Sequence, residues 1–440
     1  MTTAVALDRA LPEHLAERLR EARTRTFQLV ASLSDDELHL QHDPLMSPIL
    51  WDIGHIAHFE ELWLTRNLDG PIEFVEMPGL YNPFEHPRST RGGLPLPGMD
   101  RCREVMEEIR ERVLARISAT DGDYANPLLR DGYVYRMVLQ HEYQHNETIL
   151  QTLQLKRGAP YSPVARVAPP RASKPVPVPG SMVRFPGGAV DIGTDDRSQA
   201  YDNERPRHRV HVGPFLMDVY PVTNGEYLEF MEVGGYRRPE LWSEVGKRWL
   251  EESGAEAPKY WFERDGRWVT RTMNRTAEVD PAHPVCHVSW HEADAFARYA
   301  GKRLPTEIEW EAAASWDPAA GRKREFPWGD GPVTADLANV DQLAFGTAPI
   351  GTYPGNVSPI GCYGMIGDVW EWTSSDFRPW PGFEAFPYPE YSEVFFGDEY
   401  KVLRGGSWAT RPGAVRNTFR NWDYPIRRQI FSGFRCARDV

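Results

Sequence analysis

The sequence predicts a multidomain protein, with an N-terminal all-α four-helix bundle followed by a C-terminal α+β domain. Its 440 residues suit two or three domains. Apolar residues recur at helical spacing in residues 1–156, whereas short apolar runs between glycine and proline turns fill residues 181–440. A proline-rich connector at 157–180 separates these two patterns, so we expect the domains to meet there.

Four amphipathic stripes predict the bundle. Their positions are, in chain order, Leu15, Leu19, Ala22, Leu29 and Leu33; Trp51, His55, His58 and Leu62; Met99, Cys102, Met106, Ile109, Val113 and Ile117; and Val134, Val138, His141, His145, Thr148 and Thr152. Ser34 and Glu37 have the spacing of a capping box. Ser47-Pro48 indicates a helix start with Ser47 as the cap.

The C-terminal half is expected to hold short helices near 223–231, 289–300 and 306–315, the last after a Thr306 cap. Between them, turn clusters such as RGGSW at 404–408 require glycine where the backbone turns tightly. We expect four tryptophans to form the core of this half: Trp310, Trp370, Trp372 and Trp408.

Composition narrows the class of protein. Hydrophobic residues make up 41% and charged residues 26%, as in a soluble globular protein. The 50 basic and 63 acidic residues leave a net charge of −13, which argues against nucleic acid or an anionic membrane as a partner. No signal peptide and no membrane-spanning run is evident, and the four cysteines are far apart. We therefore expect a cytoplasmic protein with free, mostly buried thiols.

The histidines of the bundle point to chemistry. His141 and His145 are four residues apart, so they lie on one helix face, on the stripe expected to enter the core. His55 lies on the core stripe of another helix and can supply a third nitrogen. Either a metal joins the three imidazoles, or they are core histidines bonded to backbone or water. The other histidines His14, His39, His42 and His86 are expected at the surface.

Two other metal sites are disfavoured. HEYQH at 141–145 matches the zinc-protease pattern HExxH with Glu142 as general base, but the proline-rich chain that follows lacks the usual third ligand. A di-iron carboxylate bundle needs two ExxH pairs, and Asp52 with His55 is only a weak second pair. Three imidazoles alone suit Zn, Cu, Fe and Ni alike, and open coordination positions indicate catalysis.

Longer motifs show a resemblance to a known family. SPILWDIGHIAHFEELWL followed by HEYQHNE resembles the DinB-like iron-binding bundle of the ergothioneine-biosynthesis sulfoxide synthases. RLPTEIEWE, DVWEW and RGGSW are similar to motifs of the formylglycine-generating-enzyme fold, a C-type-lectin-like α+β domain. The resemblance covers nearly the whole chain, and the combination is specific for the sulfoxide synthases.

The resemblance implies an enzyme that joins a thiol to the imidazole of hercynine, using non-haem Fe(II) and O2, and that forms a C–S bond and a sulfoxide. The implied iron ligands are His55, His141 and His145. Tyr388 would be the catalytic proton donor, and γ-glutamylcysteine would be the thiol. The resemblance places the active site between the two domains.

The same resemblance implies the substrate contacts. Gln144 would bond the imidazole of hercynine, Tyr391 would bond the substrate, and Asn421 and Trp422 would help to hold hercynine. The charged ends of the glutamyl thiol would meet Arg91, Asp423 and Arg427, because guanidinium groups bind carboxylates in two-pronged fashion. Arg420 and Arg428 are close enough in sequence to exchange roles with Arg427.

Three alternatives stay open. Free cysteine can replace γ-glutamylcysteine as the thiol. A formylglycine-generating oxidase would need two nearby cysteines, whereas Cys362 and Cys436 are 74 residues apart. A metal-dependent binding module, or a thiol transferase that uses the bundle alone, is the third alternative.

Overall fold

The computed structural model describes residues 2–71, 79–119, 126–165 and 178–440, with side chains from residue 13 onward except at 118 and 119. The chain forms two compact units. The first comprises Met1–Tyr161 with two later segments, Asp196–Asp202 and Ala385–Tyr391. The second comprises Ser162–Asp195, Asn203–Glu384 and Ser392–Val440. The expected connector at 157–180 lies partly outside the described residues.

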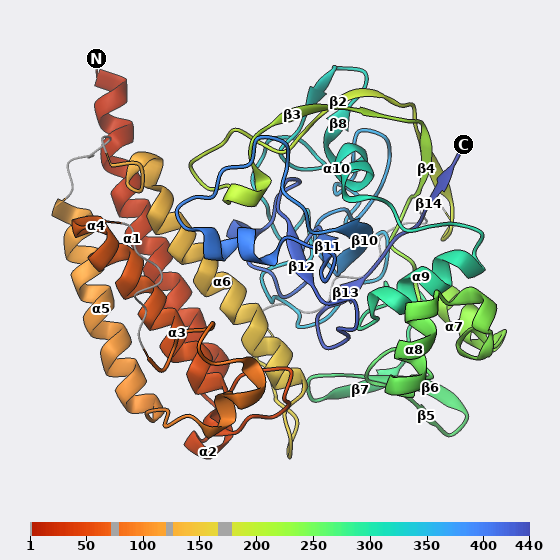
Figure 1. Cartoon of the computed structure of the whole chain (residues 1–440), viewed down its shortest axis with the longest axis horizontal. Helices are drawn as coiled ribbons and strands as arrows, with labels where there is room; N and C mark the ends of the chain where they lie inside the picture. Colours follow the sequence, from red (N-terminus) through yellow and green to blue (C-terminus); the bar gives the residue numbers. More distant parts are fainter. Residues whose placement is uncertain (1, 72–78, 120–125, 166–177) are drawn as a thin grey trace. The chain divides into compact units, whose positions relative to one another are not determined.

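The first unit is the predicted four-helix bundle (Figure 1). Its long helices are α1 (Thr2–Val30), α3 (Ile49–Glu61), α5 (Met99–Ala119) and α6 (Tyr133–Gln154), with the short α2 (Asp35–His39) and α4 (Asn67–Asp69) between them. Helix α1 packs on α5 and α6, and α3 packs on the same two helices. The apolar stripe of α5 is buried along its whole length, as predicted.

Local signals at the helix starts are partly confirmed. The Ser34–Glu37 capping box forms at α2. Ser47 is wrong as a cap, because Pro48 occupies the cap position and no side chain bonds the first turn of α3. The Ser47 hydroxyl instead accepts a hydrogen bond from Arg91 Nη1 at 2.8 Å. His42 also differs from expectation: it is buried, and its Nε2 lies 3.0 Å from the Glu37 carbonyl oxygen.

Helix α3 ends in a π-helical turn, Leu62–Arg66, before α4 begins. Such a turn inserts one residue into the helical repeat and rotates the side chains that follow. Leu62, Trp63 and Leu64 are all buried in this turn. The indole of Trp63 is thereby fixed inside the first unit.

The second unit contains the strands. One sheet has the order β1 (Met182–Phe185), β4 (Phe215–Asp218) and β14 (Ala437–Asp439), and another has the order β12 (Asn421–Asp423), β11 (Lys401–Arg404), β10 (Trp370–Asp376) and β13 (Ser432–Gly433). A third sheet has the order β5 (Trp261–Arg264), β6 (Arg267–Thr272) and β7 (Arg275–Glu278). Two-stranded sheets pair β2 (Gly188–Ile192) with β3 (His208–Val212), and β8 (Trp316–Asp317) with β9 (Arg322–Lys323). The first and last strands both pair with β4, one on each side of it, so they belong to the same sheet.

Four helices accompany these sheets: α7 (Asn224–Glu232), α8 (Glu244–Ser253), α9 (Trp290–Tyr299) and α10 (Glu307–Ser315). The expected Thr306 cap forms at α10 as a complete capping box with Glu309. Helix α8 was not predicted, although Ser243 caps its start and Gly254 ends it at φ +60°. Both residues are ordinary helix boundary signals, so the sequence contained the information.

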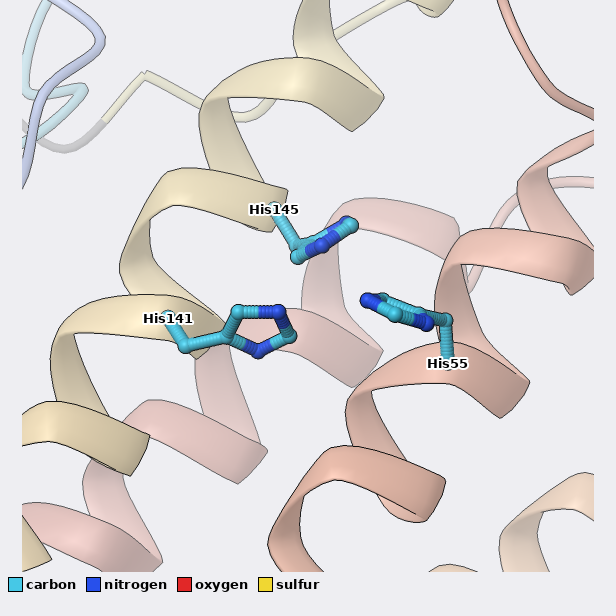
Figure 2. Close-up of side chains that lie close together, drawn as sticks. All are labelled: His55, His141 and His145. Carbon is cyan, nitrogen blue, oxygen red and sulfur yellow. The ribbon is translucent and has the colours of Figure 1, made fainter. Parts of the chain in front are cut away.

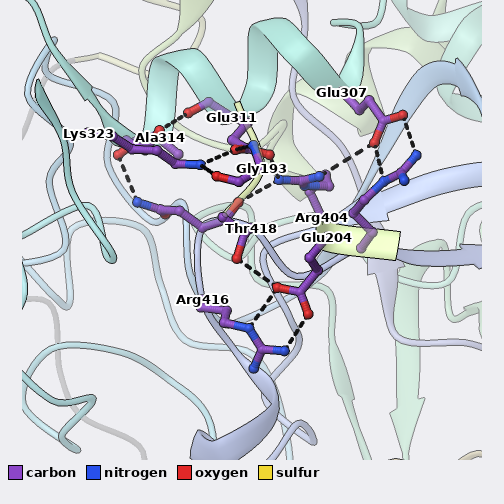
Figure 3. A network of polar contacts seen from close by, with 12 residues as sticks. Gly193, Glu204, Glu307, Glu311, Ala314, Lys323, Arg404, Arg416 and Thr418 are labelled. Carbon is purple, nitrogen blue, oxygen red and sulfur yellow. Dashed lines mark hydrogen bonds and ion pairs between the residues drawn. The ribbon is translucent and has the colours of Figure 1, made fainter. Parts of the chain in front are cut away.

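The core of the second unit includes all four predicted tryptophans. Gly405, in the RGGSW cluster, has φ +93°, and a Cβ there would lie 2.6 Å from the Met365 carbonyl oxygen, so glycine is required. Buried ion pairs surround this core (Figure 3). Arg404 Nη2 lies 2.6 Å from Glu311 Oε2, and Lys323 also pairs with Glu311. These contacts give the buried charges partners of opposite charge and hydrogen bonds, which offset the free-energy cost of burying them.

Candidate metal centre

Three imidazoles converge in the first unit. His55 comes from α3, while His141 and His145 lie one turn apart on α6, and their rings point toward one another (Figure 2). One nitrogen from each ring lies within 4.8 Å of the other two. The ring centroids are 5.1 Å apart for His55 and His141, and 5.0 Å for His55 and His145. This spacing can place three nitrogen ligands around one metal ion.

The outer nitrogens of two rings have partners. His55 Nδ1 lies 2.9 Å from the Tyr81 carbonyl oxygen, which can only accept, so this nitrogen carries the proton. His145 Nδ1 lies 3.1 Å from Asp52 Oδ1. Both contacts leave Nε2 unprotonated and able to bind a metal, the pattern that orients histidine ligands. Gly54 permits this packing, because a Cβ there would lie 2.1 Å from the Tyr81 ring.

The electrostatic environment favours neutral rings. Burial is the largest cause that lowers the pKa of His55 and of His141 well below the usual range. The neighbouring histidines lower both pKa values further. Metal ligation requires unprotonated imidazole, so the residues present fit a metal.

Glu142 takes no part in this cluster. It is buried and receives hydrogen bonds from Arg23 Nε at 3.0 Å, Arg110 Nη2 at 3.0 Å and Thr26 Oγ1 at 2.7 Å. Burial alone would raise the pKa of Glu142, but the two arginines outweigh it and lower the pKa to about 2. A carboxylate held in this way is a structural anion, so the HExxH protease interpretation fails on this observation.

Gln144 lies on the histidine face of α6 between two tyrosines. Its Nε2 donates to the Tyr391 hydroxyl at 3.4 Å, and its Oε1 accepts from the Tyr201 hydroxyl at 3.1 Å. The rings of Tyr201 and Tyr391 stack at 4.2 Å. Two segments that are distant in sequence, Asp196–Asp202 and Ala385–Tyr391, thus belong to the same unit as the histidines.

Tyr388 is buried against the bundle. Its ring stacks on Trp63 at 4.9 Å and meets the edge of Phe59 at 6.4 Å. Phe59 in turn stacks on His141 at 3.7 Å. Burial, and then the neighbouring Tyr201, raise the pKa of Tyr388 well above its usual range. The phenol therefore keeps its proton at neutral pH.

Arg91 is a buried cation of the first unit. Its guanidinium lies 3.5 Å from the centroid of the Trp51 ring, and Trp51 stacks on His55 at 4.7 Å. Its hydrogen bonds go to neutral groups, the His86 carbonyl oxygen and the Ser47 hydroxyl. In the part of the chain that the structure describes, no carboxylate lies within 4.0 Å of it. Burial lowers the pKa of Arg91 to about 9, so it stays charged at pH 7.

The remaining predicted residues belong to the second unit. Asn421, Trp422 and Asp423 form β12, and Trp422 stacks on Phe377 at 4.1 Å. Asp423 Oδ1 lies 3.3 Å from Arg427 Nε, so these two predicted residues form an ion pair. They are together in space, and their roles stay predictions.

The two arginines that could exchange roles with Arg427 both form ion pairs with glutamates. Arg420 is buried and forms a two-pronged pair with Glu307 at 2.9 and 2.8 Å. Arg428 Nη2 lies 2.9 Å from Glu292 Oε1. Both therefore stabilise the second unit, whereas Arg427 is the arginine that pairs with Asp423.

Four residues of the centre were not predicted from the sequence as site residues: Tyr201, Trp63, Tyr81 and Asp52. Tyr81 contributes only a backbone carbonyl, which no side-chain pattern can reveal. Tyr201 and Trp63 contact the predicted residues through tertiary packing. Asp52 lies three residues before His55, but this spacing suggested a second ExxH-like pair rather than a hydrogen-bond partner for His145.

The fold and the histidine cluster agree with two known families. A family described as the DinB superfamily matches residues 18–149. A family described as the sulfatase-modifying factor enzyme 1-like domain matches residues 165–440. The chain is thus a helical bundle of the first class followed by an α+β domain of the second, as its motifs predicted.

Relatives that match nearly the whole chain define its family more closely than the two domain families do. The chain is 46% identical to the hercynine oxygenase of Mycolicibacterium smegmatis, over 97% of this chain and 99% of that protein. It is 44% identical to the hercynine oxygenase of Mycobacterium tuberculosis, over 98% of this chain and 99% of that protein. Formylglycine-generating enzyme from Bos taurus is 32% identical over 59% of this chain. The chain belongs to the hercynine oxygenase family and is an oxygenase.

Proposed function

We propose that the chain is a non-haem iron(II)- and O2-dependent sulfoxide synthase that joins γ-glutamylcysteine to hercynine in ergothioneine biosynthesis. In this reaction the thiol S–H and an imidazole C–H bond break and a C–S bond forms. One oxygen atom of O2 goes to sulfur, and the other leaves as water with the two hydrogens. The observation that supports this proposal most is the trio of converging imidazoles in a relative of hercynine oxygenases.

His55, His141 and His145 would hold the iron. When bound, iron supplies O2 activation and a binding position for the thiolate, whose pKa a metal lowers. Asp52 and the Tyr81 carbonyl hold two of the rings in the tautomer that leaves Nε2 for the metal. The protein therefore contributes a preorganised face of three neutral ligands.

Tyr388 is the proposed catalytic proton donor. Its phenol is protonated and buried, so it can release a proton only to a group inside the site. The stack on Trp63 and the edge contact with Phe59 restrict the ring to one orientation. A proton donor that is fixed in a buried site, from which water is excluded, suits a reaction that uses activated O2.

Substrate binding is proposed for the other predicted site residues. Gln144 and Tyr391 would bond hercynine, and Asn421 and Trp422 would add contacts to it. Arg91, Asp423 and Arg427 would take the charged ends of γ-glutamylcysteine. Arg91 supports the choice of this thiol over free cysteine, since a buried guanidinium whose hydrogen bonds go to neutral groups favours an anionic ligand.

A formylglycine-generating type of oxidase is less well supported. Its chemistry would need reactive cysteines, yet Cys362 and Cys436 are free and fully buried. Burial raises the pKa of Cys362 to about 12 and that of Cys436 well above its usual range. Thiols in such surroundings are inert.

A turnover assay tests the proposal. The protein, loaded with Fe(II), is supplied with hercynine and O2 together with either γ-glutamylcysteine or cysteine, and product masses are measured. We expect the sulfoxide of the γ-glutamylcysteine adduct, with O2 consumed only when both substrates are present. A faster reaction with cysteine would reassign the thiol, and no C–S product with either thiol would refute the proposed function.

A further inference from the structure

Tyr201 contacts two predicted substrate-binding residues at once. Its hydroxyl donates to Gln144 Oε1 at 3.1 Å, and its ring stacks on Tyr391 at 4.2 Å with an interplanar angle of 22°. Only 2% of its surface is exposed. Nothing in the sequence near 201 resembles a site motif.

These contacts restrict Gln144. A glutamine side chain has rotatable bonds, and its amide can present either its oxygen or its nitrogen in a given direction. Because the Tyr201 hydroxyl bonds Oε1 and the Tyr391 hydroxyl accepts from Nε2, both ends of the amide are fixed. One N–H of Gln144 is thereby directed to Tyr391, while the second N–H and the remaining oxygen lone pair stay available to a ligand.

Tyr391 is restricted by the same partner. Its ring lies against Tyr201 on one side and meets the edge of Tyr388 at 6.2 Å. Burial, and then Tyr201, raise the pKa of Tyr391 well above its usual range, so the phenol is a neutral hydrogen-bonding group. Two hydroxyls and one amide thus form a connected polar group on the histidine face of α6.

We propose that Tyr201 is a specificity-determining positioning residue, which fixes Gln144 and Tyr391 in the orientation that binds the imidazole of hercynine. The inference rests on the proposed function, because it assumes that Gln144 and Tyr391 contact this substrate. It assigns to Tyr201 an effect on substrate binding and none on the iron. Preorganisation acts by removing the cost of ordering side chains when the ligand binds.

Tyr201→Phe is the sharpest variant, because it keeps the stacked ring and removes only the hydroxyl. We expect the KM for hercynine, and its Kd measured calorimetrically on the iron-loaded, oxygen-free protein, to rise about tenfold, the factor that a lost hydrogen bond in the site can produce. Iron content and kcat should change less than twofold. Tyr161→Phe, at a buried tyrosine beyond the end of α6, is the matched control and should alter neither constant.

A double-mutant cycle separates positioning from a general structural role. If Tyr201 acts through Gln144, then Tyr201→Phe should have less than a twofold effect on the hercynine Kd in a Gln144→Ala background. Multiplied effects in the double variant would overturn the inference, as would an unchanged Kd in Tyr201→Phe. If the unmodified protein failed to bind hercynine, the proposed function itself would be wrong, so the two failures are distinguishable.

Discussion

Single residues in this protein acquire their chemistry from their surroundings. Burial, and then the neighbouring His145, lower the pKa of both His55 and His141, so these two rings are neutral. His42 is buried as well, yet its nitrogens bond backbone groups, so it is an ordinary core histidine. Helical spacing in the sequence indicates the three candidate histidines. Whether each is a core residue or a metal ligand depends on its hydrogen bonds to the backbone and on how the three rings are oriented.

Removal of one imidazole should abolish metal binding. In His141→Ala the remaining two nitrogens cannot complete the three-ligand face, so we expect less than a tenth of the iron content of the unmodified protein, measured by metal analysis after purification. His14→Ala, at an exposed histidine of α1, is the control. Full iron occupancy in His141→Ala would remove this residue from the ligand set.

Loss of one hydroxyl should separate iron binding from product formation. Tyr388→Phe keeps the ring that stacks on Trp63, so we expect normal iron content and a folded protein. Without the proton donor, sulfoxide formation should fall at least a hundredfold, a typical effect of losing a general acid, and O2 should be diverted to oxidation of the thiol. Product ratios by mass spectrometry test this, and unchanged ratios would move the role to Tyr391 or elsewhere.

Helix α6 is the element on which the centre depends, because its two sides have different partners. His141, Gln144 and His145 lie on one face, while Glu142 and Asn146 enter the core of the bundle. This division follows from 3.6 residues per turn, and the sequence shows it. The partners of Glu142 could not be predicted, because Arg23 comes from α1 and Arg110 from α5.

The buried carboxylate of α6 should be essential for stability. Glu142→Gln keeps the shape of the side chain but leaves Arg23 and Arg110 with one carboxylate, Glu60, in place of two. Breaking a buried ion pair costs about 3–5 kcal/mol, so we expect a decrease of that size in the free energy of unfolding, measured with urea. Glu108→Gln, on the exposed side of α5, should stay within about 0.5 kcal/mol of the unmodified protein. A comparable loss in both variants would contradict the prediction.

At the scale of the whole molecule, buried ionisable groups link stability to pH. In the second unit, burial lowers the pKa of His287 to about 3 and that of His291 to about 4. Both rings protonate more readily in the unfolded chain, where histidine has a pKa of about 6.5. Their contribution to stability is therefore complete above about pH 6.5 and is lost as the pH falls toward the folded pKa values.

Replacing one of these rings should flatten this dependence. With a chelator present, we expect the free energy of unfolding of His291→Leu to fall less steeply below pH 6 than that of the unmodified protein, by up to about 1.4 kcal/mol per pH unit. The difference between the two proteins is the quantity to compare, because burial raises the pKa of Asp368 to about 6 and acts in the opposite direction. Equal slopes would show that His291 does not contribute. His14→Leu, at an exposed position, should leave the slope unchanged.

The sequence by itself determined the bundle, the α+β domain, the capped helices and the candidate ligands, because helical spacing and caps are local properties of the chain. It misplaced the cap of α3 and omitted α8, where local signals were misread or overlooked. The tertiary structure alone decided that segments near 201 and 388 join the bundle, that Glu142 turns away from the histidines, and that carbonyl and carboxylate groups orient two of the rings. Those outcomes depend on contacts between residues far apart in the chain, which no local pattern specifies.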